Sequence, residues 1–213
     1  MYKLHYYPAN ANAAPHMLLE ELGQKFELCV VERSTNAQKS KAYLKINPNG
    51  RIPTLENDGL VLFEAAAIVL HLVDRHPEGG MAPAIGTDER AKFYQWLIFL
   101  TNSLQEELMV YQYPDRLAGS DKAAAEIVAR GAEARASAFL DVIEDHLGAN
   151  GPFFLGTKVS AADLYLVMLA RWARGMSKPP RTRQHIAKLL DAVTARPAVQ
   201  RAYLAEGISD GIC

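Results

Sequence analysis

Cysteine is scarce in the 213-residue chain. The two present, Cys29 and Cys213, form neither a CxxC pair nor a disulfide framework. Cys29 lies in a strand-like run and is expected to be a small buried residue, whereas Cys213 is expected to be a frayed terminus. No His/Cys cluster has the spacing of metal ligands, so no metal is expected. The absence of a disulfide framework favours a reducing compartment, and we predict a cytoplasmic location.

Long apolar runs and an excess of one charge are also lacking. The longest apolar run, Leu164 to Ala170, is far shorter than the roughly 20 residues that a membrane span requires. The first residues do not lead into a signal-peptide pattern. The chain carries 23 Lys and Arg against 24 Asp and Glu, mixed along its length. Neither nucleic acid nor a membrane is therefore expected as a partner.

Strand and helix signals alternate in the first third of the chain. Short apolar runs at residues 3–7 and 26–31 predict strands, and the helix between them begins at Pro15 and ends at Gly23. Strand, helix and strand within about thirty residues is the spacing of a right-handed βαβ unit with parallel strands. A less regular helix is expected around residues 38–44.

The stretch from Asn47 to Ile68 has an unusual order of signals. Pro53 stands at the head of a short strand, a position that suits proline because it cannot donate to a strand ladder. A cis Ile52–Pro53 bond would expose the backbone groups of Ile52 to a ligand. Asp58-Gly59 predicts a two-residue hairpin turn, and the next helix opens on Glu64. The whole order, β-α-β-α-β-β-α, looks like the thioredoxin fold.

Proline and glycine are frequent between residues 76 and 88, which is typical of a linker. Beyond it the strand signals vanish, and helices are predicted at 89–113, 123–147, 161–173, 183–195 and 198–205. Ser160, followed three positions later by Asp163, predicts a capping box at one helix start. We therefore predict an α/β plus all-α protein: a thioredoxin-like domain at 1–77, a linker at 78–88 and an all-α helical bundle at 89–213.

The proline-headed strand, Glu64 before a helix and the capping box resemble the glutathione S-transferase superfamily over nearly the whole chain. Tyr6-Tyr7-Pro8 and Ala14-Pro15-His16 look closest to bacterial members. The resemblance implies a homodimeric detoxification enzyme that activates glutathione, a co-substrate, for attack on a small hydrophobic electrophile. The alternatives are a glutathione-dependent isomerase, lyase or disulfide-bond reductase, or a non-catalytic module that binds protein partners.

The resemblance also assigns residues that bind glutathione. Glu64 would take the ammonium of the γ-glutamyl end, and the helix start would take its carboxylate. Ala65 stands where the family usually has serine, which leaves only a backbone N–H. Ile52 would pair with the cysteinyl part through its backbone, with Pro53 fixing the geometry. Lys39 and Arg51 are candidates to bind the glycyl carboxylate, but each could equally be a solvated surface charge.

Family members activate the thiol with a Tyr, Ser or Thr hydroxyl from the first loop, or use a Cys there. This loop, residues 8–14, has no Ser, Thr or Cys, so chemistry that depends on a cysteine is disfavoured. Asn10 falls at the serine position, and an amide N–H can donate to a thiolate. Asn12 and Tyr6 are competing candidates, with loop capping and core packing as their alternative roles. Four residues of the 89–113 helix are candidates for the electrophile pocket, or for core or dimer contacts: Gln105, Met109, Tyr111 and Tyr113.

Overall fold

The computed structural model describes residues 1–208, so Cys213 lies outside the described residues. The chain divides into two compact units: the first joins Met1–Ala82 to a segment that starts at Thr194, and the second is Pro83–Val193. The domain limits expected from the sequence remain a prediction. The contacts differ from them at one point, because helix α10 (Pro197–Ala205) packs on α1 and belongs to the first unit.

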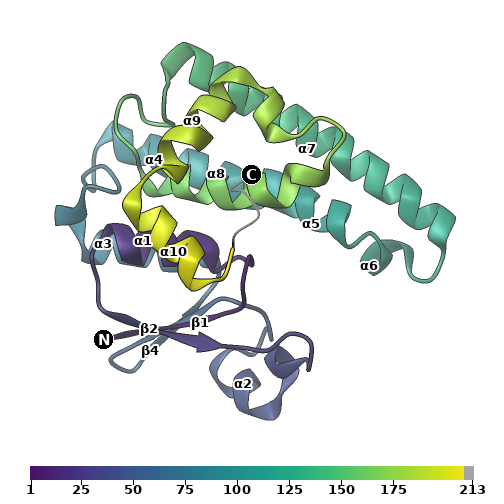
Figure 1. The fold of residues 1–213 in the computed structure, drawn as a ribbon, viewed down its shortest axis with the longest axis horizontal. Helices are drawn as coiled ribbons and strands as arrows, with labels where there is room; N and C mark the ends of the chain where they lie inside the picture. Colours follow the sequence, from purple (N-terminus) through teal and green to yellow (C-terminus); the bar gives the residue numbers. More distant parts are fainter. Residues whose placement is uncertain (209–213) are drawn as a thin grey trace. The chain divides into compact units, whose positions relative to one another are not determined.

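A four-stranded sheet of order β2-β1-β3-β4 forms the base of the first unit (Figure 1). Its strands are β1 (Tyr2–Tyr6), β2 (Phe26–Val30), β3 (Thr54–Asn57) and β4 (Leu60–Phe63). β1 is parallel to β2 and antiparallel to β3, which in turn is antiparallel to β4. Asp58 and Gly59 have φ of 49° and 86°, as a type I′ hairpin turn requires. The predicted βαβ unit and hairpin are confirmed.

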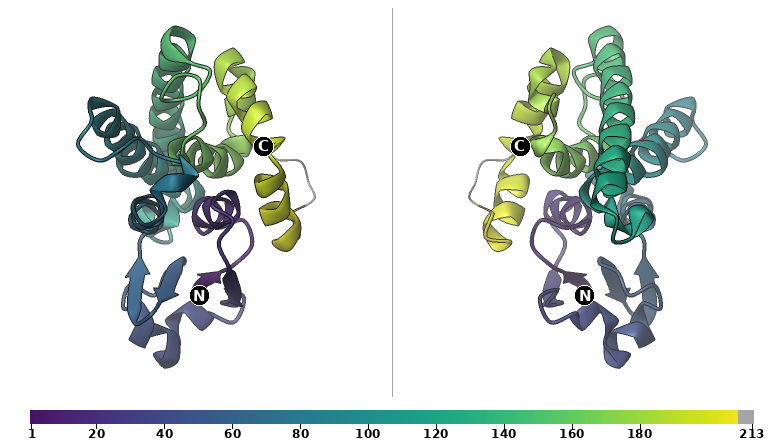
Figure 2. Two further views of the ribbon diagram at one scale, coloured as in Figure 1. Left: turned by 90° about the vertical axis from the view of Figure 1, so that its left-hand side faces the viewer. Right: turned by 90° about the vertical axis from the view of Figure 1, so that its right-hand side faces the viewer.

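Helices cover both faces of this sheet. α1 (Ala13–Glu21) and α3 (Ala65–Arg75) lie on one face, and α2 (Lys41–Ile46) lies on the other (Figures 1 and 2). Alternate residues of β1 are buried, as expected for a strand with one face against helices. α1 starts at Ala13, two positions before the predicted Pro15, and its residues through Leu19 are buried. The arrangement is thioredoxin-like, as predicted.

Cys29 differs from its prediction, because it is partly exposed rather than buried. The cause is its position on β2, an edge strand of the sheet, where one flank has no neighbouring strand. The remaining burial, together with the nearby Glu27 carboxylate, raises the pKa of the Cys29 thiol. Cys29 is therefore a poor nucleophile at neutral pH.

The second unit is built of helices joined by loops, as predicted, and its described residues add only an isolated bridge between Phe153 and Gly156. Its main helices are α4 (Asp88–Phe99), η3 (Leu100–Gln105), α5 (Glu106–Gln112), α6 (Asp115–Ala118), α7 (Lys122–Asn150), α8 (Ala161–Trp172) and α9 (Gln184–Thr194). The single helix expected at 89–113 is interrupted by η3, a π-helical segment. The end of α7 expected at Leu147 was also wrong: the helix continues to Asn150, and the Gly151–Pro152 bond that follows is cis. Within residues 1–208, no helix is long and apolar enough to cross a membrane.

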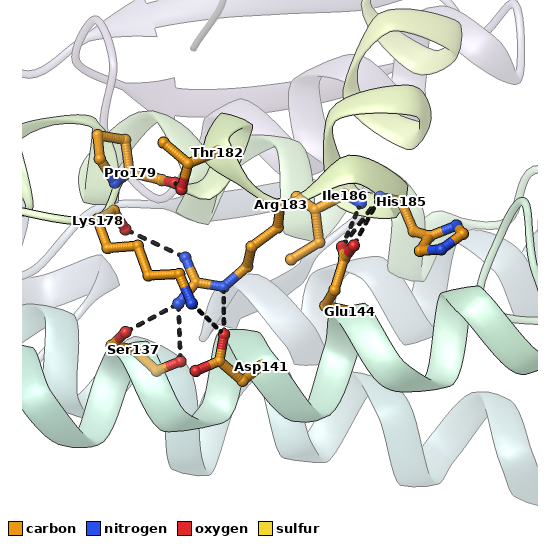
Figure 3. A network of polar contacts seen from close by, with 9 residues as sticks. All are labelled: Ser137, Asp141, Glu144, Lys178, Pro179, Thr182, Arg183, His185 and Ile186. Atoms are coloured by element: carbon orange, nitrogen blue, oxygen red, sulfur yellow. Dashed lines mark hydrogen bonds and ion pairs between the residues drawn. The ribbon is translucent and has the colours of Figure 1, made fainter.

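The side chains of α7 fix the start of α9 (Figure 3). The Glu144 carboxylate accepts the His185 backbone N–H at 2.9 Å and that of the next residue at 2.9 Å. These groups would otherwise be unsatisfied at the helix start. Arg183, whose side chain is 2% exposed, donates to the Asp141 carboxylate at 2.8 Å and to the Ser137 hydroxyl at 2.8 Å. The bonds anchor a helix whose own first turn has no acidic residue.

α8 is buried from Ala161 to Arg171 and begins with the predicted capping box. The Asp163 carboxylate accepts the Ser160 backbone N–H at 2.7 Å, the Ser160 hydroxyl at 2.8 Å and the Phe154 backbone N–H at 3.0 Å. These bonds favour the charged form, but complete burial opposes it more strongly. The pKa of Asp163 is therefore raised to about 6.

Asp163 predicts a pH dependence of stability. Its folded-state pKa of about 6 lies above the ordinary value of 3.8, so folding favours the protonated carboxyl. The resulting stabilisation is complete below the unfolded pKa and is lost as the pH rises through the folded pKa. Relative to Asp163→Asn, the free energy of unfolding should fall by roughly 3 kcal/mol across that interval. Denaturant unfolding at several pH values measures this difference.

The control is Glu126→Gln, which replaces a carboxylate whose side chain is 74% exposed. The unfolding of this variant should follow the unsubstituted protein at every pH. A constant difference between the protein and Asp163→Asn across the interval would contradict the assignment.

Candidate functional site

The strand register brings three of the predicted site segments together where β1 and β4 end and β3 begins, which we call the site edge of the sheet. Thr54 of β3 lies opposite Phe63 of β4, so Pro53 and Glu64, the next residues outward, share one end of the hairpin. Thr54 also lies opposite His5 of β1, so the loop that follows β1 leaves from the same end. The first loop, the Ile52–Pro53 segment and the start of α3 therefore converge.

The backbone of Ile52 is presented for pairing. The Ile52–Pro53 bond is cis. The Arg51 carbonyl before it accepts the Tyr43 hydroxyl at 2.9 Å and the Asn47 side-chain amide at 2.8 Å, and both of these side chains are buried. The N–H and C=O of Ile52 make no hydrogen bond within residues 1–208. An extended ligand can therefore pair with Ile52 as a strand would.

Glu64 has an uncommon backbone conformation. Its φ of 72° lies in the left-handed region, and such conformations in non-glycine residues cluster at functional sites. The carboxylate is exposed, with the Asn49 side-chain amide 3.5 Å away. α3 begins at Ala65 without a side-chain N-cap, so its first backbone N–H groups are available to an anion. A carboxylate that can bind a cation thus adjoins backbone N–H groups that can bind an anion.

The predicted cations flank the turn before Ile52. Lys39 Nζ donates to the Asn49 carbonyl at 3.2 Å, and Arg51 is exposed. Gly50, with φ of 59°, lies so close to Lys39 that a Cβ there would be 2.8 Å from Nζ. Glycine is favoured at this position because φ is positive and a Cβ would also lie 3.0 Å from the Gln38 backbone oxygen.

Asn10 is held on two sides. Its Nδ2 donates to the Pro8 carbonyl at 3.1 Å, and its Oδ1 accepts from Arg33 Nη1 at 2.9 Å. The side chain is partly exposed. Because the Pro8 bond uses one of the two amide hydrogens, the other is left for a ligand.

Asn12, the competing candidate, is fully buried and its amide is engaged. Its Oδ1 accepts the Tyr7 backbone N–H at 3.2 Å, and its Nδ2 donates to Glu206 at 2.8 Å. Glu206 also accepts His16 Nδ1 at 2.8 Å and the Ala9 backbone N–H at 2.9 Å. The geometry gives Asn12 an anchoring role in the loop, and the roles of Asn12 and Asn10 at a thiol remain predictions.

Tyr6 is 8% exposed at the end of β1. Burial, assisted by the charge of Glu206, raises the pKa of the Tyr6 hydroxyl. The hydroxyl therefore stays protonated and can only donate weakly. Its role at the thiol remains a prediction.

Two of the four predicted electrophile-pocket residues already have their polar ends engaged in the second unit. Gln105 Oε1 accepts the Tyr165 hydroxyl at 2.6 Å, and the Tyr111 hydroxyl donates to the Gly175 carbonyl at 2.9 Å. The Tyr113 ring lies 4.1 Å from the Arg116 guanidinium. Met109 is partly buried. Their contribution to an electrophile pocket remains a prediction.

The sequence did not point to Arg33, Tyr43, Asn47 and Glu206 as supports of the site. Asn47 lies in the turn that precedes Pro53, but its sequence position does not reveal that its side chain is buried. Arg33 lies in an unremarkable polar loop, and Glu206 follows the last helix. No local pattern relates either residue to the first loop. The described residues contain no group of three or more His, Cys, Asp or Glu that would hold a metal ion.

The fold defines a thioredoxin-like protein in which an exposed carboxylate adjoins the uncapped start of α3. Family comparison agrees: the family of glutathione S-transferase N-terminal domains matches residues 1–74, and that of the C-terminal domains matches residues 105–207. The chain belongs to the glutathione S-transferase family.

Individual relatives span almost the whole chain. Glutathione S-transferase 3 of Zea mays is 32% identical over 197 residues, which cover 88% of this chain and 86% of the relative. The glutathione transferase structure from Methylococcus capsulatus str. Bath has a TM-score of 0.84 and 34% identity, and covers 98% of this chain and 100% of its own. A glutathione transferase homolog from Sulfitobacter was solved with bound glutathione. It has a TM-score of 0.87 and 25% identity, and the match covers 98% of this chain and 99% of the homolog.

Proposed function

We propose that this protein is a cytoplasmic glutathione transferase that activates the glutathione thiolate for attack on a small hydrophobic electrophile, a reaction of detoxification. One observation carries the proposal: the unpaired backbone of Ile52 lies at the same sheet edge as Glu64 and the uncapped start of α3. The bound glutathione of the Sulfitobacter homolog supports the same ligand.

The γ-glutamyl end of glutathione carries an ammonium and a carboxylate side by side. Glu64 takes the ammonium through an exposed carboxylate, and the backbone N–H groups from Ala65 onward take the carboxylate. Because Ala65 has no hydroxyl, this carboxylate receives one hydrogen bond fewer than a serine would provide. The cysteinyl part pairs with Ile52, and Lys39 and Arg51 attract the glycyl carboxylate.

The thiol step is assigned to Asn10. Glutathione releases its thiol proton to solvent, and the remaining Asn10 amide hydrogen is donated to the sulfur anion. The sulfur then forms a bond with the electrophilic carbon, and the leaving group takes the electron pair of the bond that breaks. This reaction consumes glutathione, which separates it from a glutathione-dependent isomerisation.

Binding is tested by calorimetric titration with glutathione. Glu64→Gln should weaken binding about tenfold because the ammonium loses a charged partner, whereas Ala65→Ser should tighten it by up to about tenfold through a new hydroxyl. Glu78→Gln, which replaces a side chain that is 71% exposed, is the control and should bind normally. Absence of binding to the unsubstituted protein would eliminate every glutathione enzyme and leave the protein-binding module.

Catalysis is tested at Asn10. Asn10→Ala should lower kcat/KM for a model electrophile by about tenfold to a hundredfold and raise the pKa of the bound thiol, with glutathione affinity changed less than about twofold. The control is Ser34→Ala in the exposed loop nearby. Unaltered turnover and thiol pKa in Asn10→Ala would refute the role. Measuring glutathione consumption in the same assay separates transfer from isomerisation.

A homodimer is proposed from the exposed edge strand. Leu60, Val61 and Phe63 of β4 are 41%, 38% and 39% exposed, and an uncovered apolar edge favours association. Light scattering at micromolar concentration should give twice the chain mass of 23.5 kDa. Val61→Lys should shift the protein toward monomer because it places charge on this edge, whereas Val142→Lys, at a 47% exposed position on α7, should not. A monomer at that concentration would count against the proposal.

A further inference from the structure

Arg33 lies beside the first loop and is a cation without an ion pair among residues 1–208. It follows β2, whose last residue pairs with Tyr6 at the end of β1, and its side chain is partly buried. Its one hydrogen bond within residues 1–208 runs from Nη1 to Asn10 Oδ1 at 2.9 Å. The neighbouring Glu32 carboxylate accepts the Ser34 backbone N–H at 2.9 Å instead. The charge of Arg33 is therefore directed at a neutral amide, and no carboxylate of residues 1–208 forms an ion pair with it.

The two hydrogen bonds of Asn10 allow its side-chain amide only one orientation. A guanidinium has only donors, so the Asn10 atom that faces Arg33 must be the oxygen. A carbonyl has only acceptors, so the atom that faces Pro8 must be the nitrogen. A flipped amide would set donor against donor and acceptor against acceptor. The direction of the second amide hydrogen is thus fixed before any ligand arrives.

We propose that Arg33 is a positioning residue for thiol activation, which acts by orienting and polarising the Asn10 amide. A cation on the amide oxygen draws electron density from the nitrogen and makes the remaining N–H a stronger donor. The same charge adjoins the amide that would receive the thiolate, and a cation near that position favours the anion. This inference rests on the proposed role of Asn10.

The test is a pH titration of glutathione bound to the full chain, followed by the ultraviolet absorbance of the thiolate. Arg33→Met should raise the pKa of the bound thiol by about one unit and lower kcat/KM about tenfold at a pH below that pKa. Arg33→Lys keeps the charge but loses the planar fork and should give an intermediate pKa. At a pH below the pKa of the bound thiol, glutathione affinity should change less than about twofold, because the hydrogen bond of Arg33 within residues 1–208 goes to Asn10 and not to a residue proposed to bind glutathione. Arg130→Met, at a side chain that is 69% exposed, is the matched control.

A double-mutant cycle distinguishes this role from general stiffening of the loop. If Arg33 acts through Asn10, Arg33→Met should shift the thiol pKa little in the Asn10→Ala background. Equal shifts in both backgrounds would overturn the proposal, as would a thiol pKa in Arg33→Met equal to that of the unsubstituted protein. If Arg33→Met fails to fold, Arg33→Gln, which retains amide donors but no charge, provides the same comparison.

The outcomes also separate this inference from the proposed function. If Asn10→Ala raises the thiol pKa while Arg33→Met and Arg33→Gln do not, the Arg33 proposal alone is wrong. If the unsubstituted protein binds no glutathione, or if Asn10→Ala leaves the thiol pKa unchanged, the proposed thiol step fails and the Arg33 proposal fails with it.

Discussion

The first loop depends on one buried carboxylate. Glu206, 6% exposed, accepts hydrogen bonds from Ala9, Asn12 and His16, and each of these donors lies in the loop or in the helix after it. A buried carboxylate is tolerated only when hydrogen-bond donors replace the water molecules it has lost. Leaving these donors without an acceptor would also be costly. The loop that carries Asn10 is therefore held by a residue that follows α10, and its anchoring depends on the packing of α10 on α1.

The local parts of the fold could be predicted because local rules decide them. Asp58-Gly59 permits the positive φ values of a tight hairpin, and Ser160 with Asp163 marks a helix start in any context. The π-helical segment at Leu100–Gln105 has no such mark, because apolar spacing there also fits an α-helix. The assignment of α10 to the first unit depends on long-range contacts, which a helical pattern does not encode.

One part of the candidate site could likewise be predicted from local sequence, and the other part could not. Ile52, Pro53 and Glu64 lie in one continuous stretch and could be proposed together, because the hairpin between them fixes their proximity. The choice between Asn10 and Asn12 could not be made from spacing, since both are loop amides. Burial and partners distinguish them: Asn12 is fully enclosed, whereas Asn10 retains an available hydrogen. Arg33 and Glu206 acquire their importance only through contacts that the folded chain creates.

The bond between Ala9 and Glu206 spans 197 positions of the sequence, which has a consequence for synthesis on the ribosome. The hairpin and the helix start that include Ile52 and Glu64 are made of neighbouring residues and can form as soon as they emerge. The loop bearing Asn10 cannot make its bonds to Glu206 until α10 has left the exit tunnel, because Glu206 follows that helix. The segment with Ile52 and Glu64 can thus take its shape well before the loop with Asn10 is anchored.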